Sequence, residues 1–154
     1  MIRSFIFICA LFYCFFGNAQ SQIYGEWVGI LVKGKDQYHF EIKIEKGTRQ
    51  DPVVLNCYSC EKIKGGIIDF RDSTKLIAFN GIINRDWSMN LMDTKIVKKV
   101  DFEDELRAHY QFHIEKRNGE HWLIGYWQDY DNKGWKQAQG RIFLKKRPPT
   151  PEKA

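Results

Sequence analysis

A regular alternation of apolar and polar residues constrains this chain more than any other feature of its sequence. In residues 38–45 every second residue is apolar, and residues 110–115 repeat the pattern. Successive side chains of a β-strand point to opposite faces, so this alternation is typical of a strand with one buried face and one wet face. Both segments are therefore expected to be strands of an antiparallel sheet.

Other segments rich in β-branched and aromatic residues are also expected to be strands: residues 23–33, 53–58, 67–70, 75–83, 88–100, 120–130 and 139–146. Short turn signals separate them, among them Gly34-Lys35-Asp36, Gly65-Gly66 and Asn118-Gly119. Only residues 101–106 carry a pattern for a short helical turn. Eight or more short strands with tight connections predict an all-β barrel or sandwich.

The N-terminal segment has the pattern of a secretory signal peptide. Arg3 supplies a positive charge, and residues 5–16 form an almost unbroken apolar run. Gly17 and Ala19 then place small residues at the −3 and −1 positions of a cleavage site before Gln20. A membrane-spanning helix needs about 20 apolar residues, so this run is too short to cross a bilayer.

We therefore predict a signal peptide at residues 1–19, one barrel domain at 20–147 and a flexible C-terminal tail at 148–154, whose prolines cannot pair in a sheet. The mature protein is expected to be secreted or periplasmic. A retained anchor, or a lipid on Cys14, is the alternative. Removal of 19 of the 154 residues leaves 135, enough for one core without the help of disulfides.

The chain resembles the lipocalin and calycin barrels, and in particular small secreted bacterial lipocalin-like proteins. The residues that carry the resemblance are a Gly-x-Trp-x-Gly start, a late Leu-x-Gly-x-Trp strand and a basic residue on the last strand: Gly25, Trp27, Gly29, Leu123, Gly125, Trp127 and Arg141. The resemblance implies an antiparallel up-and-down β-barrel of eight to ten strands. It also implies that Trp27 closes the base of the barrel beneath Arg141, or beneath Lys145 or Arg147 if the strand register differs.

Two of the four cysteines remain after removal of the signal peptide, Cys57 and Cys60. A thioredoxin-type site would place them at the start of a helix, but Gly65-Gly66 follows too closely for one. In an exported protein we expect a local Cys57–Cys60 disulfide that closes a tight loop. Free thiols, and redox or metal chemistry, are the alternatives.

The aromatic residues indicate candidate binding positions. On the strand expected at residues 120–130, Trp122 and Tyr126 share one face and Trp127 lies on the other. Rings on both faces suggest that one set packs in the core while the other lines a pocket or a surface. We expect Trp87, Trp122 and Tyr126 to be ligand-binding aromatics, and Trp27 and Arg141 to be structural.

No metal ion or other cofactor is expected. His109 and His113 lie on one strand about 13 Å apart, too far for one metal ion. Residues 129–134 resemble the start of an EF-hand loop, but they lack its ligand pattern. No catalytic serine elbow, phosphate loop or zincin motif is present in the sequence. The net charge of +5 is modest, and an exported protein is not expected to bind nucleic acid.

Three classes of function remain open. A non-catalytic barrel that binds a small hydrophobic or amphipathic ligand requires a cavity lined by Trp and Phe. An envelope-associated or extracellular protein-interaction or inhibitor module requires a filled barrel with an exposed aromatic patch. An enzyme, which we do not expect, requires a polar cluster in the barrel mouth. We expect a monomer without a transmembrane segment in the mature chain, whose partner is a small apolar ligand or an envelope component.

Overall fold

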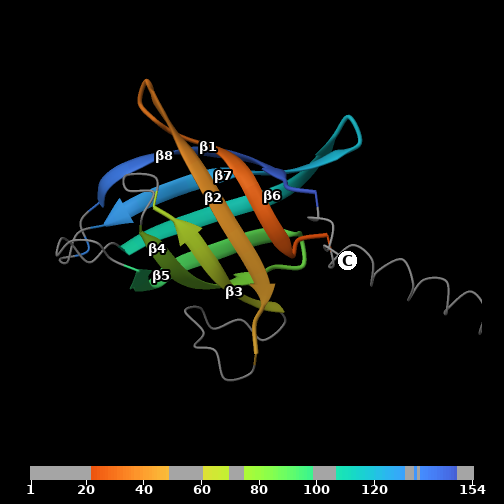
Figure 1. Ribbon diagram of the computed structural model, residues 1–154, viewed down its shortest axis with the longest axis horizontal. Coiled ribbons are helices and arrows are strands. Elements are labelled where there is room, and N and C mark those ends of the chain that lie inside the picture. The colour runs from red at the N-terminus through yellow and green to blue at the C-terminus, as the bar shows by residue number, and fades with distance from the viewer. Residues whose placement is uncertain are drawn as a thin grey trace, which may run out of the picture.

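The computed structural model describes residues 22–48, 61–69, 75–98, 107–130, 134 and 136–148. They form eight strands: β1 (Gly25–Lys33), β2 (Asp36–Lys46), β3 (Glu61–Ile68), β4 (Leu76–Ile83), β5 (Ser88–Lys98), β6 (Arg107–Arg117), β7 (Glu120–Tyr130) and β8 (Lys136–Lys146). Each strand pairs antiparallel with the next, and β8 pairs with β1, which closes the sheet into an up-and-down barrel (Figure 1). The predicted all-β barrel of eight to ten strands is confirmed, with eight.

Several sequence-based predictions lie outside the described residues. They concern the signal peptide at residues 1–19, the Cys57–Cys60 disulfide, the strand at 53–58 and most of the C-terminal tail. All of them stay predictions. The described residues include no helix of the length and apolar character that crossing a membrane requires.

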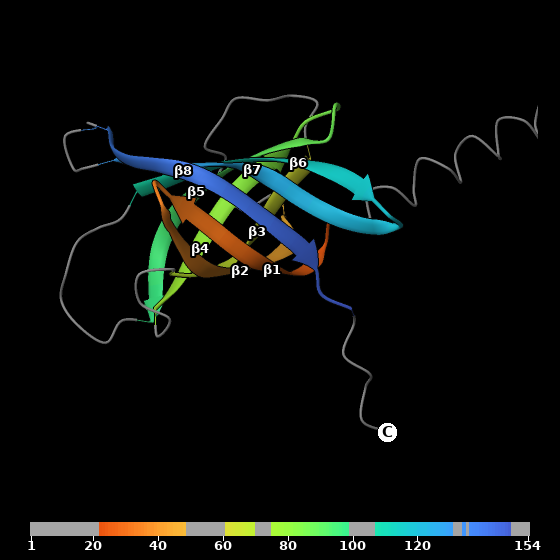
Figure 2. The same ribbon diagram turned by 90° about the horizontal axis from the view of Figure 1, so that it is seen from above.

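The first and last strands close the barrel. In the ladder that closes the barrel, Ile30 of β1 lies opposite Phe143 of β8. On the other edge of β1, the same residue lies opposite His39 of β2. Figure 2 shows β1 and β8 running side by side. Closure gives each edge strand a partner, so it removes the free edges at which sheets of different molecules could pair.

The alternation seen in the sequence places one side chain in two inside the barrel. The inward-facing side chains that are at most 3% exposed include Trp27, Leu31, Phe40, Ile42, Ile44, Ile63, Ile67, Phe79, Met89, Leu91, Tyr110, Phe112, Leu123, Trp127, Ile142 and Leu144. They form one hydrophobic cluster. The described interior is therefore a packed core, whose burial is the main favourable contribution to folding.

Glycines make this dense packing possible. Four inward-facing glycines each lie opposite a ring on a neighbouring strand: Gly29 opposite Phe40, Gly65 opposite Phe79, Gly125 opposite Phe112 and Gly140 opposite Trp127. A Cβ atom on Gly65 would lie 2.8 Å from Cε1 of Phe79, closer than carbon atoms normally approach. Pairing a missing side chain with a large ring lets a narrow barrel enclose many aromatics.

The same packing overturns one expectation from the sequence. Gly65-Gly66 was expected to be a turn, but both residues lie inside β3. In contrast, the turns at Gly34-Lys35 and Asn118-Gly119 are confirmed as tight two-residue connections. At the second of these turns both residues have positive φ, 50° at Asn118 and 81° at Gly119, as a hairpin turn of the I′ type requires.

Candidate functional site

Trp27 closes one end of the barrel. Its ring is fully buried, and its Nε1 donates a hydrogen bond of 2.8 Å to the carbonyl oxygen of Ile23, which is also fully buried. The Nζ of Lys146 lies 5.6 Å from the Trp27 ring centroid and donates a hydrogen bond to the carbonyl oxygen of Gln22. Burial lowers the pKa of Lys146. This end therefore holds a cation over an indole face, as the resemblance implied.

The cation is, however, a different residue from the expected one. Lys146 lies opposite Trp27, whereas Arg141 lies opposite Val32 near the other end of β1. Arg141 and Lys146 are separated by five positions, an odd number, so they face opposite sides of the sheet. The expected pairing of Trp27 with Arg141 is therefore corrected to a pairing with Lys146, and Arg141 lies exposed on the outer surface.

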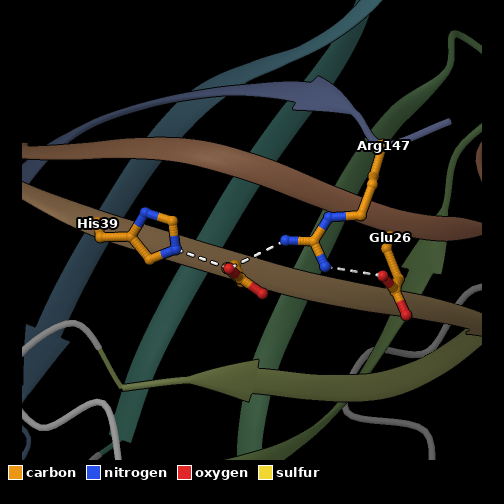
Figure 3. Close-up of polar contacts among 4 residues, drawn as sticks. Glu26, His39 and Arg147 are labelled. Carbon is orange, nitrogen blue, oxygen red and sulfur yellow. Dashed lines mark hydrogen bonds and ion pairs between the residues drawn. The ribbon is translucent and has the colours of Figure 1, made fainter.

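An ion-pair network lies on the outer surface at the same end of the barrel (Figure 3). The Nη1 of Arg147 lies 3.0 Å from Oε2 of Glu26, and its Nη2 lies 3.0 Å from Oε1 of Glu41. The Nε2 of His39 lies 2.7 Å from the same Glu41 oxygen. The hydrogen bond with His39, supported by the charge of Arg147, lowers the pKa of Glu41. The network thus ties the residue after β8 to both β1 and β2.

A hollow of about 450 Å³ borders this network on the outer face of β2, β3 and β4. Its lining includes the small residues Gly66 and Ala78, which lie opposite each other. Charges of both signs surround them in equal number: Glu26, Glu41, Glu45, Lys43, Lys64 and Arg147. These charges balance, and Lys43 and Glu45 already pair at 2.8 Å. This hollow therefore offers a ligand no net charge to recognise.

A second hollow, of about 460 Å³, lies on the outer face of β6, β7 and β8. Its outward-facing lining residues are uncharged or basic: His109, Gln111, Tyr126, Gln128, Tyr130, Gln139 and Arg141. We refer to these seven residues as the amide face. None of the described residues that line this hollow is a carboxylate.

The strand register sets the amide face in cross-strand rows. In one row Gln111 of β6 lies opposite Tyr126 of β7, which lies opposite Arg141 of β8. In the adjacent row Gln128 lies between His109 and Gln139. Directly opposite residues have Cβ atoms about 4.5–5.5 Å apart, so one small ligand could touch several of these side chains together.

Side chains of the amide face also contact aromatic rings. The Cζ of Arg141 lies 5.5 Å from the centroid of Tyr126 and 5.1 Å from that of Phe143. The ring centroids of His109 and Tyr130 are 4.9 Å apart. Burial lowers the pKa of His109, which favours the neutral form of its imidazole. Tyr126 is nevertheless 56% exposed, and its ring is open to a ligand.

Of the three aromatic residues expected to bind a ligand, Tyr126 alone belongs to the amide face. Trp122 also lies on β7, but opposite Glu115 and Lys145, four residues away from Tyr126. Trp87 lies in the turn between β4 and β5 with a φ of 65°, partly buried against the core. The structure thus distributes the three rings over separate places.

Nothing in the sequence alone distinguishes Gln111, Gln128 and Gln139 as binding residues. A single outward-facing amide on a strand does not indicate a binding site, because polar residues are expected at all outward-facing positions. The three amides come together only when the register aligns three neighbouring strands, which places Gln111 in one cross-strand row and Gln128 and Gln139 in the adjacent row.

Comparisons of the chain with known protein families, curated proteins and solved structures find no match. Among the described residues, no group of three or more His, Cys, Asp or Glu side chains is placed to hold a metal ion. A functional proposal therefore depends on the geometry of the barrel and its outer surface.

Proposed function

We propose that this protein is an exported, lipocalin-like module that keeps its barrel filled and binds an envelope or extracellular component on the amide face. The observation that carries the proposal is the contrast between a packed interior and an ordered hollow outside. Export is proposed from the signal-peptide pattern of residues 1–19.

The packed interior favours an interaction module over a carrier of small hydrophobic ligands. A carrier would need rings that line an open mouth. The Trp and Phe side chains of the described interior are instead at most 2% exposed: Trp27, Phe40, Phe79, Phe112 and Trp127. They belong to one hydrophobic cluster with the aliphatic core, which leaves the outer face as the better binding surface.

The lipocalin-like assignment is supported by strand order and by the closed end. Eight strands follow one another around the barrel, and the last pairs with the first. Trp27 near the start of β1 packs beneath Lys146 at the end of β8, which matches the arrangement of an early Trp and a late basic residue.

The charge pattern of the outer surface also favours the amide face. Elsewhere, acidic and basic side chains pair with each other, as Glu115 does with Arg117 and Glu120 with Lys145. Binding surfaces are typically enriched in Tyr and Arg and depleted in Lys, Glu and Asp. Tyr126 and Arg141 at the centre of a carboxylate-free lining fit this composition.

The test is co-sedimentation of the protein, purified from its native host, with isolated cell envelopes of that host. We expect saturable binding, weakened at least about tenfold, or about 1.4 kcal/mol, in the double variant Tyr126→Ala/Gln128→Ala. The matched control is Gln37→Ala, because Gln37 is an exposed glutamine on β2 that does not line the hollow and lies two strands beyond Arg141. Binding that the double variant retains in full would refute the proposal.

A second measurement addresses the carrier function directly. Titration with a fluorescent fatty-acid analogue should give no saturable signal, because the described interior has no open lining of aromatic rings. Saturable binding with one site per chain, retained in Tyr126→Ala/Gln128→Ala, would instead assign the protein to the carriers of small hydrophobic ligands.

A further inference from the structure

We infer that the component bound by the amide face is a glycan, an inference that rests on the function proposed above. Its sugar rings would lie across the cross-strand rows, stacked on Tyr126 and hydrogen-bonded by the glutamine amides.

The hydrogen-bonding groups of the face match those of a sugar. Each sugar hydroxyl can donate one hydrogen bond and accept others. A glutamine side chain likewise offers both kinds of group, two N–H donors and a carbonyl acceptor. Gln111, Gln128 and Gln139 occupy three neighbouring strands within one hollow, so adjacent hydroxyls of a sugar ring could be matched together.

The exposed ring of Tyr126 supplies the second element of sugar recognition. A pyranose ring has an apolar face of C–H groups, which can pack on an aromatic ring. Tyr126 is 56% exposed, and the guanidinium of Arg141 already lies against its ring. Because this contact already orders the ring, little conformational entropy is lost when a ligand binds. Stacking of even one sugar residue can therefore contribute to the affinity.

The charge of the amide face also favours a sugar. A carboxylate in the lining would be costly to desolvate beneath an uncharged ligand, and the described lining contains none. Arg141 is the one Arg or Lys among the described residues that line the hollow, and burial favours the neutral form of His109 by lowering its pKa. Arg141 could pair with an acidic substituent of the glycan, or hydrogen-bond to hydroxyls of a neutral one.

A further hollow extends the amide face across the neighbouring strands, as the binding of a glycan of several sugar residues requires. His109 and Gln111 also line a hollow of about 160 Å³ over β4, β5 and β6. There Asn90 lies opposite Gln111, and Asn80 is a further lining amide. Accessible amide side chains thus continue over four neighbouring strands, β5 to β8, and end at the buried Asn80 of β4. The centre of a protein–protein interface is typically more apolar. A protein partner is therefore the less suitable occupant.

The decisive experiment repeats the co-sedimentation assay with treated envelopes. Periodate cleaves the vicinal diols of sugars, whereas protease removes proteins and leaves glycans in place. We expect periodate to abolish binding and protease to leave it unchanged. The soluble polysaccharide fraction released from the same envelopes, freed of protein, should compete for binding to the wild type.

Variants connect this result to the amide face. Tyr126→Ala should weaken competition by the polysaccharide fraction at least tenfold, while Tyr126→Phe, which keeps the ring, and the control Gln37→Ala should retain it. If binding depends on the amide face but is abolished by protease and resists periodate, the glycan is wrong and the proposed function stands. If Tyr126→Ala/Gln128→Ala binds envelopes as the wild type does, the proposed function itself fails.

Discussion

The indole of Trp27 is held by the core on its inner side, by the carbonyl oxygen of Ile23 at its Nε1, and by the Nζ of Lys146 over its ring. Loss of so large a buried ring leaves a cavity, so Trp27→Ala should lower the free energy of unfolding by about 3–5 kcal/mol. Lys146→Met, which keeps the aliphatic stem, should cost only about 0.5–1 kcal/mol, the range of a partly exposed cation–π contact.

A double-mutant cycle in denaturant separates these contributions. Trp27→Leu combined with Lys146→Met should give a coupling energy above zero, and Trp27→Leu combined with Arg141→Ala should give none. Arg141 serves as the matched control because it lies on the outer face, opposite Val32. The reverse result would restore the pairing that the resemblance implied.

Glu41 gives the fold a dependence on pH. Hydrogen bonding to His39 and the charge of Arg147 hold its pKa below the ordinary value of 4.5, so the carboxylate stabilises the folded state above that pH. This contribution is lost as the pH falls through the lowered pKa. Glu41→Gln should therefore be less stable than the wild type at pH 7, by less than about 1 kcal/mol because water screens the network.

Thermal unfolding from pH 7 to pH 3 measures this effect. The curves of the wild type and Glu41→Gln should converge in acid. Glu45→Gln is a suitable control, because within the described part of the chain Glu45 pairs with Lys43 alone, and its side chain is more exposed than that of Glu41. A difference that stayed constant down to pH 3 would show that Glu41 acts through packing and not through its charge.

At the scale of a strand, the adjacent glycines of β3 should respond in opposite ways to the same substitution. A Cβ on Gly65 would lie 1.8 Å from the carbonyl oxygen of Lys43 and against the ring of Phe79, so Gly65→Ala should cost about 1–3 kcal/mol. The nearest atom to a Cβ on Gly66 is the flexible Cδ1 of Leu76, at 3.1 Å. Gly66→Ala should change stability by no more than about 0.5 kcal/mol.

Urea unfolding of the two variants checks this prediction, with circular dichroism to confirm that each remains folded. Equal effects at the two positions would mean that the barrel can widen at β3, and that ring packing over Gly65 does not limit it.

The same glycines show how far the sequence predicts the elements. The expected strand at residues 120–130 coincides with β7, because its alternation and the Asn118-Gly119 turn agree. The sequence predicts a strand at residues 67–70, because Gly65-Gly66 resembles a turn, whereas β3 spans Glu61–Ile68. The carbonyl oxygen of Lys43 and the ring of Phe79, on the two neighbouring strands, explain why a glycine belongs in the middle of this one.

The candidate site was less predictable than the fold. Tyr126 could be selected as an outward-facing ring from the alternation of its own strand. The partners Gln111 and Arg141 could not, because their place beside it depends on the register of three strands. The register also decides which basic residue covers Trp27, since a shift of one position moves every side chain of β8 to the other face.

At the scale of the whole molecule, the barrel domain begins and ends at one place. The backbone N–H of Arg147 donates a hydrogen bond of 2.8 Å to the carbonyl oxygen of Glu26, and Lys146 bonds to Gln22. A circular permutant that joins Pro148 to Gln22 through a short flexible linker, with new ends at the Asn118-Gly119 turn, should therefore fold. We expect it to lose no more than about 1–2 kcal/mol of stability, because only the loop closures change.

Far-ultraviolet circular dichroism and thermal unfolding test the permutant. A permutant without a cooperative thermal transition would show that the turn between β6 and β7 must be intact for the barrel to fold. The matched control is the wild-type order carrying the same linker at its C-terminus.

The ladder between β1 and β8 also sets an order in time. Arg147 and Glu26 are 121 positions apart, so their contact forms only after nearly the whole domain has emerged from the ribosome or from an export channel. Contacts between such distant segments make folding slow. Under the export proposed above, this delay would help the chain to cross a membrane unfolded: every piece that lacks β8 leaves one edge of β1 without its partner strand, and the barrel can close only once the last strand has arrived.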